Sequence, residues 1–242
     1  MDPAKPHLFV GRHDRWCEVC NKPDRNPIHD LAGVAKKIVQ VGYDDGVDDY
    51  DIWVKQVSGS PRFEWLDELC VLLPVGSRVL ELGIGAGTRS SRQILEQNHS
   101  LLGVDISQEQ LSRAAARLPG ASLMRADMAT LDFAVSSFDA VVAFFSLIHL
   151  PLPELSALLR RARRWLSPDG YLLATFGTED TPAAVTTWLG RPMFVASGPP
   201  DWNLDQLSGA GFQVVRSEVI GQHEPGAGNV DYHWILARAD GG

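Results

Sequence analysis

The stretch Val79-Leu-Glu-Leu-Gly-Ile-Gly-Ala-Gly87 is a short apolar run that stops at three alternating glycines. Residues 78–82 are rich in leucine and β-branched side chains, and this composition predicts a buried β-strand. Residues 88–97 then return to a helical composition. Because glycine permits positive φ angles and lets a ligand approach the backbone closely, the glycines indicate a tight turn between strand and helix. Such a turn is also compatible with a purely structural role.

Short apolar runs and amphipathic segments alternate from residue 77 to about residue 176. This succession is typical of a parallel sheet that helices cover on both faces, and such sheets bind ligands at the carboxyl ends of their strands. Ser107 is expected to cap one helix, with Gln110 three residues later in a capping box. Further strands are expected near residues 101–104, 123–124, 140–145 and 171–176, further helices over residues 107–118 and 153–166, and a turn at residues 167–170.

Carboxylates stand at three consecutive predicted strands, as Glu81, Asp105 and Asp127. Asp105 follows the glycines by about 20 residues, the spacing at which a carboxylate meets a ribose diol in doubly wound folds. A dinucleotide fingerprint would need a glycine where Thr88 stands, and the sequence has no Gly-Lys-Ser/Thr phosphate loop. Three carboxylates at one edge of a sheet repel a pyrophosphate and suit a cationic nucleoside.

With these residues in this order, residues 40–240 resemble the class I S-adenosylmethionine-dependent methyltransferases of the small-molecule type. Residues 79–87 are similar to the first motif of that family, and residues 138–150 are similar to its fourth motif. The resemblance implies an α/β fold: a Rossmann-like, doubly wound, mostly parallel seven-stranded sheet whose last strand is antiparallel. Residues 212–219 and 232–238 match the two final strands of that fold.

The resemblance also implies S-adenosylmethionine as cofactor, with a role for each matching residue. Glu81 would hold the amino group of the methionine part, Asp105 both ribose hydroxyls, and Asp127 the exocyclic amine of adenine. Tyr43 resembles a tyrosine of the family's N-terminal lid, although its segment is equally compatible with an acidic helix docked on the core. The implied cofactor-binding residues are Tyr43, Glu81, Gly83, Gly85, Gly87, Asp105, Ile106, Asp127, Met128, Phe144 and Ser146.

Methyl transfer from a sulfonium is an in-line displacement in which the protein mainly aligns the reactants and excludes water. A hydroxyl acceptor benefits from a base, and His149 is the candidate catalytic residue because an imidazole with a pKa near ~6.5 is largely neutral at neutral pH. Lining the pocket, or capping the turn before Pro151, is the competing interpretation of His149. The predicted activity is methyl transfer to an O or N atom of a small-molecule acceptor, with secondary metabolism as the suggested context.

The chain is expected to divide into three parts. Residues 1–30 form a small Cys/His-containing arm, residues 31–76 a helical lid, and residues 77–242 the methyltransferase core. An acceptor cap is expected around residues 178–205, where Trp188 and its apolar neighbours suit a small apolar or aromatic acceptor, or else cover the edge of the sheet.

The arm carries a Cys-x-x-Cys pair, Cys17 and Cys20, which is able to place two thiolates on one metal ion. Zinc in structural sites prefers four S and N ligands, and His29 and His7 are the candidate third and fourth ligands. His13 competes for the fourth position, because the spacings are wide. A polar arm with two reduced thiols is the equal alternative to a structural zinc site.

Composition restricts the possible partners. Hydrophobic residues make up 45% of the 242 residues, and the net charge of −8 counts against nucleic acid, whose partners are usually basic. No apolar run approaches the ~20 residues that span a bilayer, and no secretory h-region follows the first residues. Three cysteines do not make a disulfide framework, so a soluble, reduced, cytoplasmic protein is expected. A homodimer is left open.

Two other function classes compete with the methyltransferase. An NAD-dependent oxidoreductase uses a similar fold, but Thr88 and the lack of a Tyr-x-x-x-Lys pair near the fifth strand argue against it. A non-catalytic module that docks a partner through its arm has no physical need for the carboxylates at the strand ends. The identity of the acceptor and the atom that is methylated are not readable from the sequence.

Overall fold

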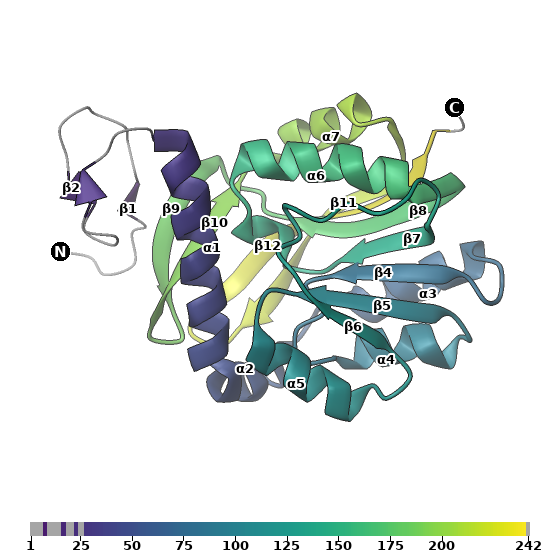
Figure 1. The fold of residues 1–242 in the computed structure, drawn as a ribbon, viewed down its shortest axis with the longest axis horizontal. Helices are drawn as coiled ribbons and strands as arrows, with labels where there is room; N and C mark the ends of the chain where they lie inside the picture. Colours follow the sequence, from purple (N-terminus) through teal and green to yellow (C-terminus); the bar gives the residue numbers. More distant parts are fainter. Residues whose placement is uncertain (1–6, 9–15, 18–21, 24–26, 241–242) are drawn as a thin grey trace.

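The computed structural model describes residues 7–8, 16–17, 22–23 and 27–240, and a seven-stranded sheet forms its centre (Figure 1). The strand order is β11-β12-β8-β7-β4-β5-β6, and β12 runs antiparallel to both of its neighbours. The predicted doubly wound sheet with an antiparallel last strand is therefore confirmed. The strands are β4 (Arg78–Leu82), β5 (Ser100–Asp105), β6 (Ser122–Arg125), β7 (Phe138–Ala143), β8 (Leu166–Phe176), β11 (Phe212–Glu224) and β12 (Gly228–Ala239).

Five helices pack on the two faces of this sheet: α3 (Arg62–Leu72), α4 (Arg89–Glu96), α5 (Gln108–Arg117), α6 (Leu152–Trp165) and α7 (Pro200–Gly209). Successive strand residues point to opposite faces. Leu80 and Leu82 of β4 therefore join the core beneath α6 and α7, whereas Val79 joins the core beneath α3, α4 and α5. Figure 1 shows α6 and α7 on one side of the sheet and α4 and α5 on the other. Because both faces are covered, the central strands are apolar along their length.

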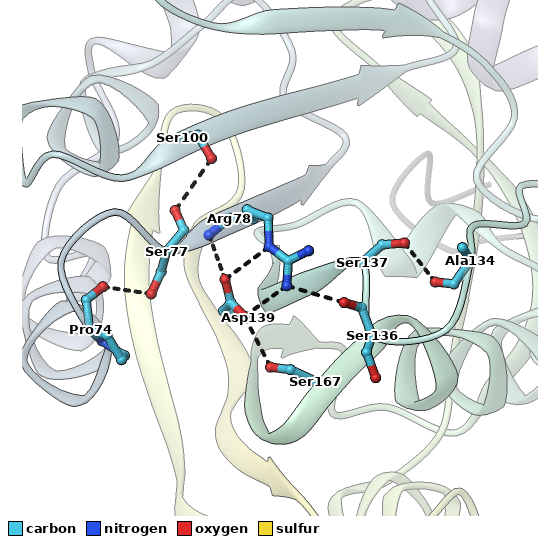
Figure 2. Close-up of polar contacts among 9 residues, drawn as sticks. All are labelled: Pro74, Ser77, Arg78, Ser100, Ala134, Ser136, Ser137, Asp139 and Ser167. Carbon is cyan, nitrogen blue, oxygen red and sulfur yellow. Dashed lines mark hydrogen bonds and ion pairs between the residues drawn. The ribbon is translucent and has the colours of Figure 1, made fainter.

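Hydrogen bonds tie β4, β7 and β8 together at their amino ends (Figure 2). Asp139 accepts from the backbone N–H of Arg78 at 2.8 Å and from its guanidinium at 3.1 and 3.2 Å. Ser167 Oγ donates to the same carboxylate at 3.1 Å. These contacts fix the register of the three strands and so determine where their carboxyl ends lie.

Strand β8 contains the predicted turn as an irregularity. Leu166 pairs with Phe138 and Tyr171 pairs with Ala140, so residues 167–170 stand opposite a single residue of β7. Asp169 within this segment has a φ of +62°, in the left-handed region. The turn is therefore present, but inside a strand that begins five residues earlier than predicted.

The region around residues 178–205, expected as an acceptor cap, forms a β-hairpin that runs into α7. Its strands β9 and β10 are joined by Leu189 and Gly190, whose φ angles are +48° and +75°. Two left-handed residues in succession are typical of the tight turns that match the twist of a hairpin. Val39 of helix α1 packs against Met193 of this hairpin. The elements are β1 (His7–Leu8), β9 (Thr181–Trp188) and β10 (Arg191–Ser197), which form one antiparallel sheet, and α1 (Pro27–Asp45).

The segment expected as a helical lid is largely helical and contains most of α1, all of α2 (Val47–Val54) and all of α3. Helix α1 begins at Pro27, inside the segment assigned to the arm. Before it, the described residues pair as β1 with β9 and as β2 (Trp16–Cys17) with β3 (Lys22–Pro23). Asp51 of α2 forms ion pairs with Arg113 and Arg117 of α5, which fastens α2 to the core. Of the helices in the described part of the chain, none has the length and apolarity to span a membrane.

The last two strands extend further than the sequence predicts. Strand β8 pairs with β12 only from His233 to Arg238, so residues 220–232 project beyond the carboxyl edge of the sheet. We call this projecting segment the hairpin overhang. It is tied to the segment around α2: Ser58 and His223 exchange backbone hydrogen bonds of 3.1 and 2.8 Å, and Trp53 Nε1 donates to the carbonyl of Pro225 at 3.2 Å.

Candidate active site

A pocket lies at the carboxyl ends of β4, β5 and β7, where doubly wound sheets bind their ligands. Helices α1 and α2, the β9–β10 hairpin and the hairpin overhang supply its remaining walls. Nine of the twelve residues predicted from the sequence line it: Tyr43, Gly83, Gly85, Asp105, Ile106, Met128, Phe144, Ser146 and His149. Glu81, Gly87 and Asp127 are not among the lining residues.

The glycine turn has the backbone that the sequence predicts, since Gly83, Gly85 and Gly87 have φ angles of +77°, +57° and +72°. Two of them are needed for packing. A Cβ on Gly83 would stand 2.4 Å from Ser146 Cβ, and one on Gly87 would stand 2.8 Å from Leu118 Cδ1. A Cβ on Gly85 would meet nothing closer than 3.8 Å. The open space at Gly85 therefore faces the pocket and is available to a ligand.

Asp105 fastens the glycine turn to the end of β5. Its Oδ2 accepts from the backbone N–H of Gly85 at 2.8 Å, and its Oδ1 accepts from the N–H of Ser107 at 2.9 Å. Burial raises the pKa of this carboxyl to about 6, against the backbone hydrogen bonds that lower it. A carboxylate has about four lone-pair sites, so each oxygen is still able to accept one further hydrogen bond from the pocket.

Gln110 is a pocket residue that the sequence analysis assigned only to a helix cap. Its backbone N–H donates to Ser107 Oγ at 3.1 Å, as expected for the predicted N-cap. Its side chain does not complete the capping box, because Asp105 already accepts the N–H of Ser107. The amide is 1% exposed, and neither its nitrogen nor its oxygen has a partner among the described residues. Since buried amides are normally hydrogen-bonded, this one indicates a polar ligand.

His149 is held between a backbone carbonyl and a tyrosine. Its Nδ1 lies 2.8 Å from the carbonyl oxygen of Phe194, which only accepts, so Nδ1 carries the proton. Its Nε2 is then the acceptor for the Tyr43 hydroxyl at 2.9 Å. Burial lowers the pKa of His149 and raises the pKa of Tyr43 well above its usual value. Both side chains are therefore neutral at neutral pH, and the lone pair of the imidazole, on Nε2, accepts the Tyr43 hydroxyl at the pocket wall.

Four aromatic rings of the pocket wall contact one another, and we call them the aromatic wall: Tyr43, Tyr50, Trp53 and Trp188. Ring centroids lie 5.7 Å apart for Tyr43 and Tyr50, 5.5 Å for Tyr43 and Trp188, and 5.4 Å for Trp53 and Trp188. The sequence analysis expected Trp188 in an acceptor cap and Tyr43 in a lid. The structure brings the two segments together above the sheet edge.

The backbone at the end of β7 is in an unfavourable conformation. Phe145 has a φ of +57°, which costs a non-glycine residue roughly 1–2 kcal/mol. Its N–H donates to Thr175 Oγ1 at 2.5 Å, and its ring packs edge-on against Tyr232, with centroids 4.7 Å apart. Non-glycine residues held in this region cluster at functional sites. The conformation turns the chain so that Ser146 and His149 face the pocket.

Arg62 of α3 is a cation in the pocket wall that the sequence analysis missed. Its guanidinium lies 4.7 Å from the ring centroid of Phe145 and 5.2 Å from that of Phe144. Its hydrogen bond among the described residues goes to Ser90 Oγ at 3.5 Å, and no carboxylate there forms an ion pair with it. Burial lowers the pKa of this side chain, although Tyr50 and Glu81 raise it. A desolvated guanidinium of this kind suits an anionic ligand.

Glu81, Gly87 and Asp127 are predicted to bind the cofactor but lie outside the pocket lining. Asp127 forms an ion pair with Lys36 of α1 at 2.9 Å, and Lys36 also pairs with Glu154 of α6 at 3.1 Å. Glu81 lies behind the glycine turn, 3% exposed, and burial raises its pKa to about 7. Gly87 packs on α5. The cofactor roles of these three residues therefore remain predictions that the pocket geometry does not support directly.

The predicted zinc ligands fall mainly on the undescribed part of the chain. Cys20 and the competing His13 lie outside the described residues, and of His7, Cys17 and His29 only the backbone is described. Within the side chains that are described, no group of three or more His, Cys, Asp or Glu is arranged to hold a metal ion. The zinc site remains a prediction.

Comparison with known proteins agrees with this geometry. Residues 79–170 match the model of a family described as a methyltransferase domain. A phosphatidylethanolamine N-methyltransferase of Cereibacter sphaeroides is 34% identical over 111 residues, which cover 43% of this chain and 52% of that protein. A 27-O-demethylrifamycin SV methyltransferase of Amycolatopsis mediterranei is 32% identical over 141 residues, which cover 54% of this chain and 51% of that protein. The chain thus spans about half the length of these two relatives.

The fold is shared with solved structures over a greater length. The crystal structure of a 1,6-didemethyltoxoflavin-N1-methyltransferase of Burkholderia thailandensis superposes with a TM-score of 0.66 at 23% identity. The superposition covers 98% of this chain and all of that one, so the additional helices and the β9–β10 region fall within the compared length. The family model, the relatives and the shared fold lead to one conclusion: residues 79–170 of this chain are a methyltransferase domain, and they lie within a fold that the chain shares with a methyltransferase of known structure.

Proposed function

We propose that the protein transfers a methyl group from S-adenosylmethionine to an O or N atom of a small-molecule acceptor. The observation that carries the proposal is one pocket in which the open Gly85 and Asp105 adjoin a neutral histidine at the end of β7. The apolar and aromatic character of the other walls supports a small acceptor. The names of two similar proteins, which act on 27-O-demethylrifamycin SV and 1,6-didemethyltoxoflavin, support this acceptor class. Secondary metabolism, a cytoplasmic location and a homodimer remain predictions.

The residues present fit the donor. Asp105 has lone pairs for two ribose hydroxyls, Ile106 and Met128 offer apolar contact for the adenine, and Gln110 has an unpartnered amide. The open position at Gly85 admits close approach to the backbone. We assign the carboxylate of the methionine part to Arg62, because this guanidinium lines the pocket without an ion-pair partner among the described residues.

S-adenosylmethionine, when bound, supplies a methyl group on a sulfonium, and its transfer joins the methyl carbon to the acceptor while the carbon–sulfur bond breaks and leaves its electrons on sulfur. The chain's own part is to align the acceptor, exclude water and remove a proton. Tyr43 occupies His149 Nε2 in the structure. When the Tyr43 hydroxyl turns aside, Nε2 accepts the acceptor's proton, and the hydrogen bond to the Phe194 carbonyl keeps the ring in place.

Titration calorimetry with S-adenosylmethionine, S-adenosylhomocysteine and NAD in parallel tests the proposal. We expect micromolar binding of the first two ligands and no binding of NAD, because the pocket presents carboxylates where a pyrophosphate would need cations. Binding of NAD alone would overturn the proposal. A folded sample that binds none of the three, with and without candidate acceptors, would also count against it.

Replacing Arg62 with methionine is expected to weaken S-adenosylhomocysteine binding at least about tenfold, since a charge-assisted hydrogen bond contributes about 1.5–3 kcal/mol. Binding of 5′-methylthioadenosine, which lacks the amino-acid part, should change less than twofold. Arg89→Met is the matched control, because Arg89 also stacks on an aromatic ring, Phe63, but lies exposed at the start of α4. Equal losses for both ligands in Arg62→Met would remove the carboxylate assignment.

A further inference from the structure

The hairpin overhang buries polar side chains against the pocket. Gln222, Glu224 and Tyr232 are 4%, 7% and 8% exposed, and all three line the pocket. They alternate along β11 and β12 with exposed residues such as His223, so one face of the overhang points inward. Burying three polar residues on this face is costly unless they have partners.

The hydrogen bonds among these residues have a defined direction. Tyr232 Oη donates to Glu224 Oε1 at 2.9 Å, and Gln222 Nε2 donates to the same oxygen at 2.8 Å. An ionised carboxylate only accepts, so Gln222 must present its amino group to Glu224 and keep its carbonyl free. Gln222 Oε1 is buried and has no partner among the described residues. The overhang therefore offers the pocket two acceptors, Gln222 Oε1 and Glu224 Oε2, whereas the Tyr232 hydroxyl and one N–H of Gln222 already bond Glu224.

Glu224 also lacks a counter-charge. None of the ion pairs within the described part of the chain includes it, although buried carboxylates are normally paired with a cation. Arg62, the cation in the same pocket, lies over Phe145 and hydrogen-bonds Ser90. Glu224 and Arg62 thus line the same pocket, and neither of them forms an ion pair within the described part of the chain.

The order of the strands separates Glu224 and the rest of the hairpin overhang from the nucleoside site. Four strand intervals lie between β5, which ends in Asp105, and β12, which carries Tyr232, and at about 4.8 Å each they span roughly 19 Å. The overhang therefore lies on the far side of β4 and β7 from the predicted ribose site. Tyr50, Trp53 and Trp188 of the aromatic wall line the pocket together with it, and Trp53 donates a hydrogen bond to Pro225 within it.

We propose that the hairpin overhang and the aromatic wall form the acceptor subsite, and that they take a small molecule carrying a basic amine, bound as its cation. A carboxylate, a free carbonyl and several aromatic faces are the groups that bind organic cations, by charge, hydrogen bonding and attraction to the ring faces. A phenolate or carboxylate acceptor would instead be repelled by Glu224. The inference rests on the proposed methyl transfer and narrows its acceptor class.

Titration of protein saturated with S-adenosylhomocysteine by benzylamine and by benzyl alcohol tests this subsite. The two probes share ring and size, but only benzylamine is a cation at neutral pH. We expect benzylamine to bind the wild type at least tenfold more tightly than benzyl alcohol, and this ratio to fall to about one in Glu224→Gln. Glu218→Gln is the matched control, because Glu218 lies on the same strand, exposed, and pairs with Arg216 at 2.8 Å.

The affinity for S-adenosylhomocysteine distinguishes a failure of the acceptor subsite from a failure of the proposed function. It should change less than twofold in Glu224→Gln; a tenfold loss would mean that Glu224 holds the amino group of the donor, and would overturn the acceptor subsite. Binding of S-adenosylhomocysteine with no preference for benzylamine in the wild type would overturn the subsite alone. Absence of S-adenosylhomocysteine binding would overturn the proposed function itself.

Discussion

Replacing His149 with alanine is expected to lower turnover by about 10²- to 10⁴-fold, the range that a positioned general base contributes. The reason is the neutral imidazole, whose Nδ1 donates to the Phe194 carbonyl. Its Nε2 accepts the Tyr43 hydroxyl in the structure and becomes available to the acceptor when that hydroxyl turns aside. Affinity for S-adenosylhomocysteine should change less than twofold. The measurement is the initial rate of S-adenosylhomocysteine formation from S-adenosylmethionine and acceptor, beside calorimetry of the product.

The pH profile distinguishes a base from a packing residue. Burial lowers the pKa of His149, so its imidazole stays neutral across the pH range in which histidines usually titrate and at somewhat lower pH. Protonation removes the lone pair of Nε2, and the rate should therefore fall as the pH falls through this lowered pKa. At saturating S-adenosylmethionine, where weaker donor binding by protonated Asp105 does not limit the rate, the variant His149→Ala should lack that acid limb.

Two further variants control for the loss of packing. The amide of His149→Asn retains a donor for the Phe194 carbonyl but is not a base, so its rate should match that of His149→Ala. His99→Gln changes a histidine that is also buried but lies outside the pocket lining, before the amino end of β5, and its rate and pH profile should follow the wild type. Normal turnover of His149→Ala at every pH would exclude the base role.

The predictable part of the site lies where local sequence decides geometry. The glycine turn, Asp105, Ile106 and Met128 follow strands whose apolar runs are visible in the sequence, and the carboxyl ends of parallel strands meet at one edge. Their positions therefore follow once the fold class is recognised. The capping box predicted for Gln110 is wrong in one half. The Gln110 N–H does donate to Ser107 Oγ, but the N–H of Ser107, which the glutamine side chain would accept in a capping box, donates to Asp105 instead.

The remaining walls depend on contacts between segments that are distant in sequence. The β9–β10 hairpin lacks the Asn-Gly or Asp-Gly signal of a tight turn and uses Leu189 and Gly190 instead. The hairpin overhang buries polar residues, Gln222 and Glu224, on its inward face. The sequence does not show which residues they bond, and without those partners polar residues in alternation indicate a solvated loop. Arg62 is the first residue of α3, and the sequence of that helix does not indicate that the arginine side chain lines the pocket.

Asp127 is a residue whose place in the fold follows from the sequence but whose partner does not. Its place at the end of β6 suggested a contact to adenine, and the strand does reach this edge of the sheet. The structure gives it Lys36 as a partner, from a helix about 90 residues earlier in the chain. Lys36 also pairs with Glu154, so one ammonium group of α1 links α6 to the segment that follows β6.

Replacing Asp105 with alanine is expected to weaken S-adenosylhomocysteine binding on the order of 100-fold, or about 2.8 kcal/mol, because two charge-assisted hydrogen bonds to the ribose hydroxyls are lost. In the wild type the affinity should also fall as the pH drops below about 6, the pKa to which burial raises this carboxyl. The hydroxyls bind the ionised form, so protonation of Asp105 removes the acceptor. Calorimetry across this pH range measures both effects.

Asp105 also accepts the N–H groups of Gly85 and Ser107, so the alanine variant loses stability along with its ribose contact. A ratio of two affinities removes that ambiguity, because a smaller folded fraction weakens all ligands equally. Wild-type protein should bind adenosine far more tightly than 2′,3′-dideoxyadenosine, and Asp105→Ala should bind the two alike. A ratio that survives the substitution would assign the hydroxyls to another group, and the unpartnered amide of Gln110 is the nearest candidate, 3.8 Å from a Cβ built on Gly85.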